Sequence, residues 1–215
     1  MTKYDTFLFD WDGTLTHTIP QWVSATRQVL GKHGHAPSDA YIAQHIAPNL
    51  TPGLKKYTSD VDAMIDEIVA TEQIQNLHLS PMHFEAERTI ERLMGENKKV
   101  AIVSTNFRRK IDMAIEHHQL FRSIGDKLVI VAFEDVINRK PHPEPIYTAL
   151  ERLGVSTAGA LMVGDSYTDV GAAKSANIPI AIHHPSAHKE YFSQAYIDAF
   201  GANYVIDKLD QVRTL

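Results

Sequence analysis

The chain has 215 residues, of which 44% are hydrophobic, and a formal net charge of −5 with its 12 histidines counted as neutral. This length suits one globular core with a smaller appended module, the weakly acidic balance argues against a nucleic-acid partner, and the absence of cysteine excludes disulfides and thiolate zinc sites. Because no stretch approaches the ~18 apolar residues of a membrane span, we expect a cytoplasmic protein without a membrane segment.

The first predicted element is a strand at residues 6–9, a short apolar run that ends in acidic residues. The segment that follows shows no strand pattern and carries helical spacing at residues 21–30, 40–45 and 61–74. Pro37, Pro48 and Pro52 separate these helical segments. We therefore expect an all-helical insertion, residues 17–80, within one core domain made of residues 1–16 and 81–215.

After the insertion, apolar runs of strand length alternate with segments of helical spacing. Continuous apolar runs are typical of strands that are buried on both faces, and the alternation predicts a parallel α/β sheet of Rossmann-like type flanked by helices. Such sheets bind ligands beyond the carboxyl ends of their strands. The expected strands are residues 100–103, 128–132, 160–163, 179–182 and 204–206, and the expected helices are residues 85–94, 110–120, 145–153 and 169–176.

Two carboxylates, Asp10 and Asp12, stand two positions apart where the first predicted strand gives way to a loop. If strand geometry continues, both point to the same side, and nearby carboxylates repel each other unless a cation or a proton lies between them. Mg²⁺ prefers such oxygen ligands, and Gly13 allows the backbone to approach a ligand closely. The alternative is a solvated strand end with two surface acids.

Two other strand ends carry polar side chains. Asp165 follows residues 160–163, and Asp169 lies four positions beyond it, where the pair can face one ion or cap the following helix. Ser104, Thr105 and Asn106 follow residues 100–103, where hydroxyl and backbone N–H groups can hold a phosphate oxygen or cap a helix.

Lys140 is followed by Pro141 and, two positions later, by Pro143, which restrict the backbone. A lysine held in this way can act as a positioned charge for phosphate, or it can belong to an ordinary basic loop. The order of the motifs decides between these alternatives. Asp-x-Asp comes first, then a serine, then Lys-Pro, then Gly-Asp-Ser-x-x-x-Asp, all at strand ends. From about residue 3 to 207, this order resembles the four motifs of the haloacid dehalogenase (HAD) superfamily.

The resemblance implies a magnesium-dependent phosphatase that hydrolyses a small-molecule phosphate monoester through an aspartyl-phosphate intermediate. It also implies that the helical insertion is a type 1 cap, as in members similar to phosphoglycolate phosphatase and β-phosphoglucomutase. The implied metal site comprises Asp10, Asp12, Asp165 and Asp169. By the same resemblance, Asp10 is the nucleophile, and Asp12 is the general acid/base whose carbonyl contacts Mg²⁺. Thr14 supports the phosphate loop with Gly13, and Ser104, Thr105 and Asn106 contact the phosphate. Lys140 is the partner of Asp10, and Asp165 and Asp169 bind the metal.

Asp12 also narrows the reaction within the superfamily. Dehalogenases lack this second aspartate because carbon–halogen cleavage needs no proton for the leaving group, and phosphonate-cleaving relatives carry a small residue there. Two alternatives stay open: a phosphomutase with the same core, and a non-catalytic binding protein that kept the fold. The expected partner is a phosphorylated small molecule, and the sequence leaves open whether the protein is a monomer or a dimer.

Several further residues invite weaker hypotheses. His17 stands where relatives often carry an acid at the hinge into the cap, and it can contact substrate or make a local hydrogen bond. Lys55 can reach the substrate from the cap or form part of a solvated pair with Lys56. The adjacent His183 and His184 are poor joint metal ligands because neighbours on a strand point to opposite faces, and we expect them on the surface.

Overall fold

A six-stranded parallel sheet lies at the centre of the computed structural model. The structure describes residues 3–124 and 127–215, so residues 1–2 of the predicted core segment 1–16 lie outside the described residues. The strand order is β3-β2-β1-β4-β5-β6. Every strand lies within one residue of a predicted apolar run at each end, which confirms the parallel α/β fold. The strands are β1 (Thr6–Phe9), β2 (Lys99–Val103), β3 (Val129–Val131), β4 (Ala160–Gly164), β5 (Ile180–His183) and β6 (Tyr204–Ile206).

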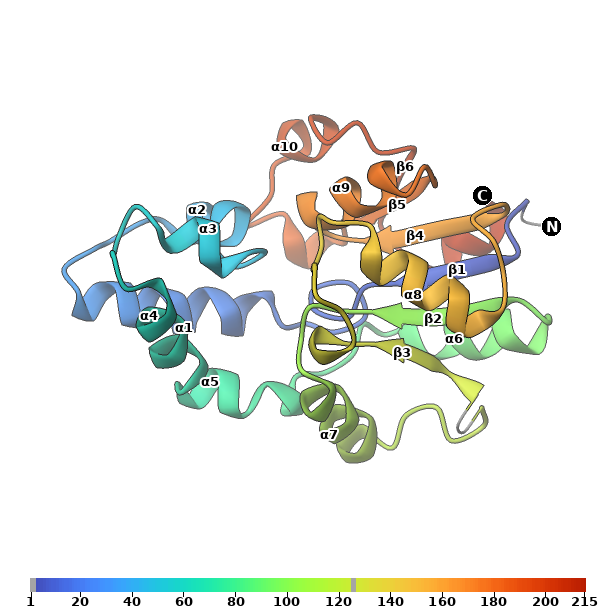
Figure 1. Cartoon of the computed structure of the whole chain (residues 1–215), viewed down its shortest axis with the longest axis horizontal. Helices are drawn as coiled ribbons and strands as arrows, with labels where there is room; N and C mark the ends of the chain where they lie inside the picture. The colour runs from blue at the N-terminus through green and yellow to red at the C-terminus, as the bar shows by residue number, and fades with distance from the viewer. Residues whose placement is uncertain (1–2, 125–126) are drawn as a thin grey trace.

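Helices cover both faces of this sheet (Figure 1). Phe7 and Phe9 of β1 pack with α6 and α7 on one face, and Leu8 packs with α8 and α9 on the other. Burial on both faces explains why the strands are mostly apolar rather than alternating between apolar and polar residues. These helices are α6 (Ala86–Gly95), α7 (Arg108–His118), α8 (Glu144–Leu153) and α9 (Tyr167–Ser175), and the short segments η3 (Phe133–Asp135), η4 (Ser186–His188), α10 (Gln194–Asp198) and η5 (Leu209–Thr214) complete the core.

All the named elements between β1 and α6 are helical. This insertion lies at the opposite end of the sheet from the chain termini (Figure 1), beside the carboxyl end of β1. The chain leaves and re-enters the core at neighbouring points, because the His17 N–H donates to the Pro81 carbonyl at 2.9 Å and Thr16 pairs with Met82. A division into core and cap domains near these residues stays a prediction. The helices are α1 (Ile19–Lys32), α2 (Asp39–His45), α3 (Leu50–Leu54), α4 (Val61–Val69), α5 (Glu72–Gln75) and η1 (Leu77–Leu79).

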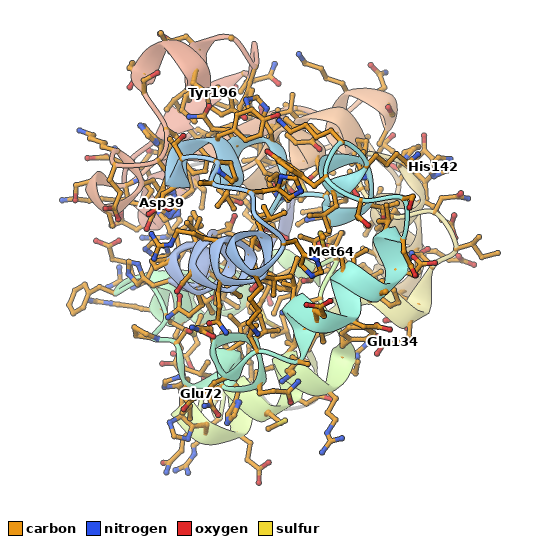
Figure 2. The ribbon with its side chains drawn as sticks, turned by 90° about the vertical axis from the view of Figure 1, so that its left-hand side faces the viewer. Asp39, Met64, Glu72, Glu134, His142 and Tyr196 are labelled. Atoms are coloured by element: carbon orange, nitrogen blue, oxygen red, sulfur yellow. The ribbon has the colours of Figure 1, made fainter. Side chains whose placement is uncertain are left out.

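The insertion also contacts the core away from this crossing point. The Tyr196 hydroxyl donates to the Gln44 carbonyl at 3.0 Å, and Gln44 Nε2 donates to the Tyr191 carbonyl at 2.6 Å. Figure 2 faces the insertion and shows α2, whose first residue is Asp39, beside the core segment that carries Tyr196. These two hydrogen bonds therefore hold α2 against the core.

Two predictions for the insertion were wrong. Residues 61–74 form two helices rather than one, because the backbone of the buried Thr71 is extended and not helical. The Thr71 hydroxyl donates to the Ile68 carbonyl at 2.7 Å. Pro52 does not separate helices but lies within α3, in the first turn, where a missing N–H is tolerated. None of the described helices is long and apolar enough to cross a membrane.

Candidate active site

The strand order reverses at β1, because β2 and β3 lie on one side of it and β4 to β6 lie on the other. Asp10 follows β1, and Asp165 follows the neighbouring strand β4. The Asp10 N–H donates to the Val163 carbonyl at 2.9 Å, which holds the two strand ends together. Open parallel sheets bind ligands at this reversal point, so the fold places the predicted acidic residues where a ligand is expected.

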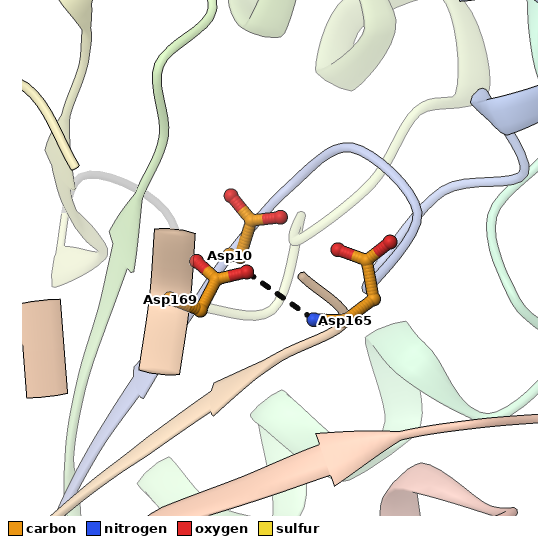
Figure 3. A group of neighbouring side chains, drawn as sticks. All are labelled: Asp10, Asp165 and Asp169. Atoms are coloured by element: carbon orange, nitrogen blue, oxygen red, sulfur yellow. Dashed lines mark hydrogen bonds between the residues drawn. The ribbon is translucent and has the colours of Figure 1, made fainter. Parts of the chain in front are cut away.

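Asp10, Asp165 and Asp169 come together at this edge (Figure 3), with one oxygen of each within 4.8 Å of the others. All three are buried, at 6%, 6% and 0% exposure. The ammonium group of the buried Lys140 donates to Asp10 Oδ1 at 2.5 Å and to Asp169 Oδ1 at 2.6 Å. One buried cation does not balance three buried carboxylates, so the cluster carries excess negative charge.

The second oxygen of Asp169, Oδ2, is held by the start of α9. It accepts hydrogen bonds from the Ser166 N–H at 3.1 Å, from the Ser166 hydroxyl at 2.7 Å and from the Asp165 N–H at 3.3 Å (Figure 3). A Cβ atom on Gly164 would lie 2.4 Å from Asp169 Cγ, so only glycine leaves room for this side chain. Asp169 thus caps a helix and also joins the acidic cluster, and its role in binding an ion stays a prediction.

Asp12 is oriented by two donors from different parts of the fold. Trp22 Nε1, in α1 of the insertion, donates to Asp12 Oδ1 at 3.3 Å. Asn106 Nδ2 donates to Asp12 Oδ2 at 2.9 Å, and the Asn106 Oδ1 atom accepts from the Phe107 N–H at 2.8 Å, which fixes the orientation of the amide. Sequence analysis missed Trp22. The signal that could have found it was an indole N–H in the helix after the acidic motif, since a buried indole usually finds an acceptor.

Burial dominates the electrostatics of the site. Burial raises the pKa of Asp10 to about 7 against the opposing effect of Lys140, and the charge of Asp169 adds to the rise. Burial also raises the pKa of Asp165, together with the charges of Asp10 and Asp169, and it raises the pKa of Asp12. For Lys140, burial lowers the pKa, but the two carboxylates outweigh it and the pKa is raised overall. A cluster of carboxylate oxygens with raised pKa values suits a hard divalent cation.

The loop after Asp12 packs directly against the acids. Gly13 has a φ of +77°, in the left-handed region, and a Cβ atom there would lie 2.4 Å from Asp165 Oδ2. The Thr14 hydroxyl lies 3.4 Å from both Asp10 Oδ2 and Asp165 Oδ1. The loop therefore leaves no space for a side chain at Gly13, and it bridges the two strand ends through Thr14.

Gly13→Ala is expected to cost stability twice, through backbone strain of about 1–2 kcal/mol and through the clash with Asp165. Gly34→Ala is the matched control, because Gly34 has a φ of +80° and a Cβ atom there would meet no described atom within 4 Å. Urea unfolding should show the larger loss for Gly13→Ala, with reduced catalytic activity in that variant alone. Equal losses and full activity in both variants would contradict this account of Gly13.

The Ser104–Asn106 turn follows β2, the other neighbour of β1. The buried Ser104 hydroxyl accepts from the Asn106 N–H at 3.0 Å, so its own hydrogen is free to donate to a ligand. Thr105 is half-buried in the same turn. Helix α7 begins only after this turn, with Phe107 in the cap position, so Ser104 does not cap the helix.

The weaker hypotheses have different outcomes. Lys55 is exposed at the end of α3, so its contact with a substrate stays a prediction. The half-buried His17 packs its ring on that of His83, with 3.7 Å between ring centroids. The expectation that His183 and His184 lie on the surface was wrong, since they are 2% and 4% exposed. The rings of His83 and His188 pack against His183, and the His184 N–H donates to the Ile206 carbonyl of the neighbouring strand at 2.7 Å.

Known proteins resemble this chain along most of its length. A family model described as haloacid dehalogenase-like hydrolase matches residues 7–182. Pyrophosphatase PpaX of Bacillus mycoides (strain KBAB4) is 30% identical over 216 residues, which cover 98% of this chain and 95% of that protein. A candidate haloacid dehalogenase-like hydrolase from Bacteroides fragilis has a similar structure, with a TM-score of 0.81 and 24% identity over 97% of this chain and 99% of that one. For a candidate phosphoglycolate phosphatase from Lactobacillus plantarum, the TM-score is 0.78 and the identity 26%, with both chains fully covered.

Proposed function

The chain belongs to the haloacid dehalogenase-like hydrolase family, and from this premise we propose that it is a magnesium-dependent phosphatase acting on small-molecule phosphate monoesters. The observation that carries the proposal is the buried contact of Lys140 with Asp10, beside Asp165 and Asp169. A carboxylate that is held by a cation at a ligand-binding sheet edge is placed to attack a phosphorus atom. The names of relatives add pyrophosphate and phosphoglycolate as candidate substrates.

In the proposed reaction, a carboxylate oxygen of Asp10 attacks the phosphorus atom and forms an aspartyl phosphate as the ester P–O bond breaks. Asp12 gives its proton to the departing alkoxide and then accepts a proton from the water that hydrolyses the aspartyl phosphate. The raised pKa of Asp12 suits the first of these tasks, because the proton must be present when the ester oxygen leaves. The contacts from Trp22 and Asn106 keep the carboxyl group of Asp12 oriented through both steps.

The positive charge of Lys140 and the donors of the surrounding turns have a separate task. Lys140 offsets repulsion between the anionic substrate and Asp10, and the free hydrogen of the Ser104 hydroxyl can donate to a phosphoryl oxygen. Mg²⁺, held by Asp10, Asp165 and Asp169, would supply further charge to stabilise the phosphoryl oxygens in the transition state. We further propose that the Asp12 backbone carbonyl contacts the metal and that the insertion closes over the bound substrate.

Phosphate release from p-nitrophenyl phosphate, pyrophosphate and phosphoglycolate, with and without Mg²⁺, tests the function. Release should stop in EDTA and return when Mg²⁺ is added, because the excess charge of the acidic cluster is then compensated. Mg²⁺ at 100 times its Kd should also stabilise the folded protein by about 2.7 kcal/mol and so raise its melting temperature.

The metal site itself has a matched control. Asp165→Asn should remove the stabilisation by Mg²⁺, and Asp112→Asn, the same change on an exposed residue of α7, should keep it. Full activity in EDTA would refute the metal requirement. A stable aspartyl phosphate without phosphate release would favour the phosphomutase alternative, and Mg²⁺ binding without either reaction would favour a binding protein.

A further inference from the structure

Four histidine rings from three distant parts of the chain form one cluster beside the acidic site. His17 begins the insertion, His83 follows its return to the core, His183 ends β5, and His188 lies in η4. The ring centroid of His83 lies 3.7 Å from the ring centroid of His17, 4.7 Å from that of His183 and 5.5 Å from that of His188. Apart from the half-buried His17, these residues are at most 6% exposed. Burying polar imidazole groups lowers the stability of a protein unless they form hydrogen bonds, so the partners of these rings need an explanation.

This histidine cluster contacts the back of the catalytic loop. His183 Nδ1 lies 3.1 Å from the Thr14 carbonyl oxygen, and the His83 backbone N–H donates to the Leu15 carbonyl at 2.8 Å. The hydroxyl of the same Thr14 faces the carboxylates of Asp10 and Asp165 on the other side. One short loop therefore joins the acids to the histidines.

The tautomer of His183 follows from this contact. A carbonyl oxygen only accepts hydrogen bonds, so Nδ1 must carry the proton. The groups that face His183 are the rings of His83, His188 and His17, and no carboxylate is among the causes of its shifted pKa. Burial, together with the charges of these neighbouring rings, lowers the pKa of His183 to about 2 against the opposing hydrogen bond to Thr14, so the ring is neutral near pH 7. A neutral donor fixed by packing gives the Thr14 carbonyl a partner without adding a charge next to the acidic site.

We propose that His183 is a positioning residue of the reaction: its Nδ1–H holds the Thr14 carbonyl, and through it the loop 13–15, against Asp10 and Asp165. The inference rests on the proposed function for its catalytic consequence, but not for the anchoring itself. Among the described residues, the group with three ligand atoms within 4.8 Å of one another is the aspartate cluster, so the role assigned to the histidines is hydrogen bonding rather than metal binding.

Two substitutions separate the hydrogen bond from the packing. His183→Leu keeps a branched side chain but removes the donor, and His183→Asn keeps an N–H donor at the same number of bonds from Cβ as Nδ1. His184→Leu is the matched control, because His184 is equally buried and its ring nitrogens have no hydrogen-bond partner in the described structure. Thermal melts of all three variants would verify that each is folded at the assay temperature.

The first readout is hydrogen exchange of the peptide that covers residues 11–16, which needs no enzymatic activity. His183→Leu should accelerate exchange there by about threefold to tenfold, and His183→Asn and His184→Leu should leave it near the wild-type rate. The second readout is steady-state kinetics with p-nitrophenyl phosphate and Mg²⁺. His183→Leu should lower kcat by about 10- to 100-fold with a smaller change in KM, because a displaced loop misaligns the reacting groups, and His183→Asn should restore most of the loss.

The possible results lead to different conclusions. Unchanged loop exchange in His183→Leu, equal effects of His183→Leu and His184→Leu, or failure of His183→Asn to restore either readout would each overturn the positioning role. If the exchange results are as expected but the wild-type protein hydrolyses no phosphate ester, the anchoring of the loop stands and the proposed function fails.

Discussion

Asp10→Asn is expected to lower the rate of phosphate release by at least about 10³-fold, because an amide cannot act as the nucleophile that forms the aspartyl phosphate. The variant should remain folded. Asp10 is buried beside Asp165 and Asp169, and burial holds its pKa near 7, so removing its charge relieves repulsion. Lys140 keeps Asp169 as a partner at 2.6 Å. We therefore expect a melting temperature in EDTA that equals or exceeds that of the wild type.

The measurements are steady-state phosphate release and thermal unfolding of the same preparation. Asp112→Asn is again the control for the chemical change, because Asp112 is exposed on α7, and its activity should match the wild type. Turnover by Asp10→Asn at more than a few per cent of the wild-type rate would disprove the covalent mechanism. A lower rate accompanied by unfolding would show instead that Asp10 is needed for the fold.

Lys140→Met is expected to lower the free energy of unfolding by about 3–5 kcal/mol at pH 8, the usual cost of leaving buried charges without their partner. Lys140 is 4% exposed and is the shared cation of Asp10 and Asp169, at 2.5 and 2.6 Å. The variant should also lose most of its phosphatase activity, because nothing then offsets the repulsion between substrate and nucleophile. Urea unfolding in EDTA measures the stability without a contribution from Mg²⁺.

The pH dependence gives this prediction a second check. The pKa of Asp10 is about 7 with Lys140 present and must rise without it, so Asp10 becomes neutral at about pH 5.5 and no longer needs a cation. The loss caused by Lys140→Met should therefore be smaller at about pH 5.5 than at pH 8. Lys98→Met is the control, since Lys98 pairs with the exposed Asp5 at 2.6 Å and should contribute about 0–1 kcal/mol. Equal losses of unfolding free energy in the two variants would show that the buried ion pairs of Lys140 stabilise the protein no more than an exposed one.

The positions of the strands and the nature of the acidic site could be predicted from particular residues. The run at 160–163 is apolar at every position and the run at 6–9 at every position except Thr6, which is typical of strands buried on both faces. Asp10 and Asp165 come directly after these runs, and the carboxyl ends of parallel strands share one edge. The sequence therefore predicted that these acids meet, before any distance was known. It could not predict that Trp22 binds Asp12, because the direction in which α1 leaves the core is set by packing of the whole insertion.

The sequence by itself determined the fold class, the strand positions and the residues of the acidic cluster, because hydrophobic periodicity and the order of motifs can be read along the chain without knowledge of its folding. Only the tertiary structure decided which histidines are buried together, since His17, His83 and His183 are distant in sequence and meet where the insertion joins the core. The break at Thr71 has a local cause instead, because its hydroxyl donates to the Ile68 carbonyl three residues back and competes with helix continuation. Contacts between distant segments depend on how the elements pack, and that information is absent from any single stretch of the chain.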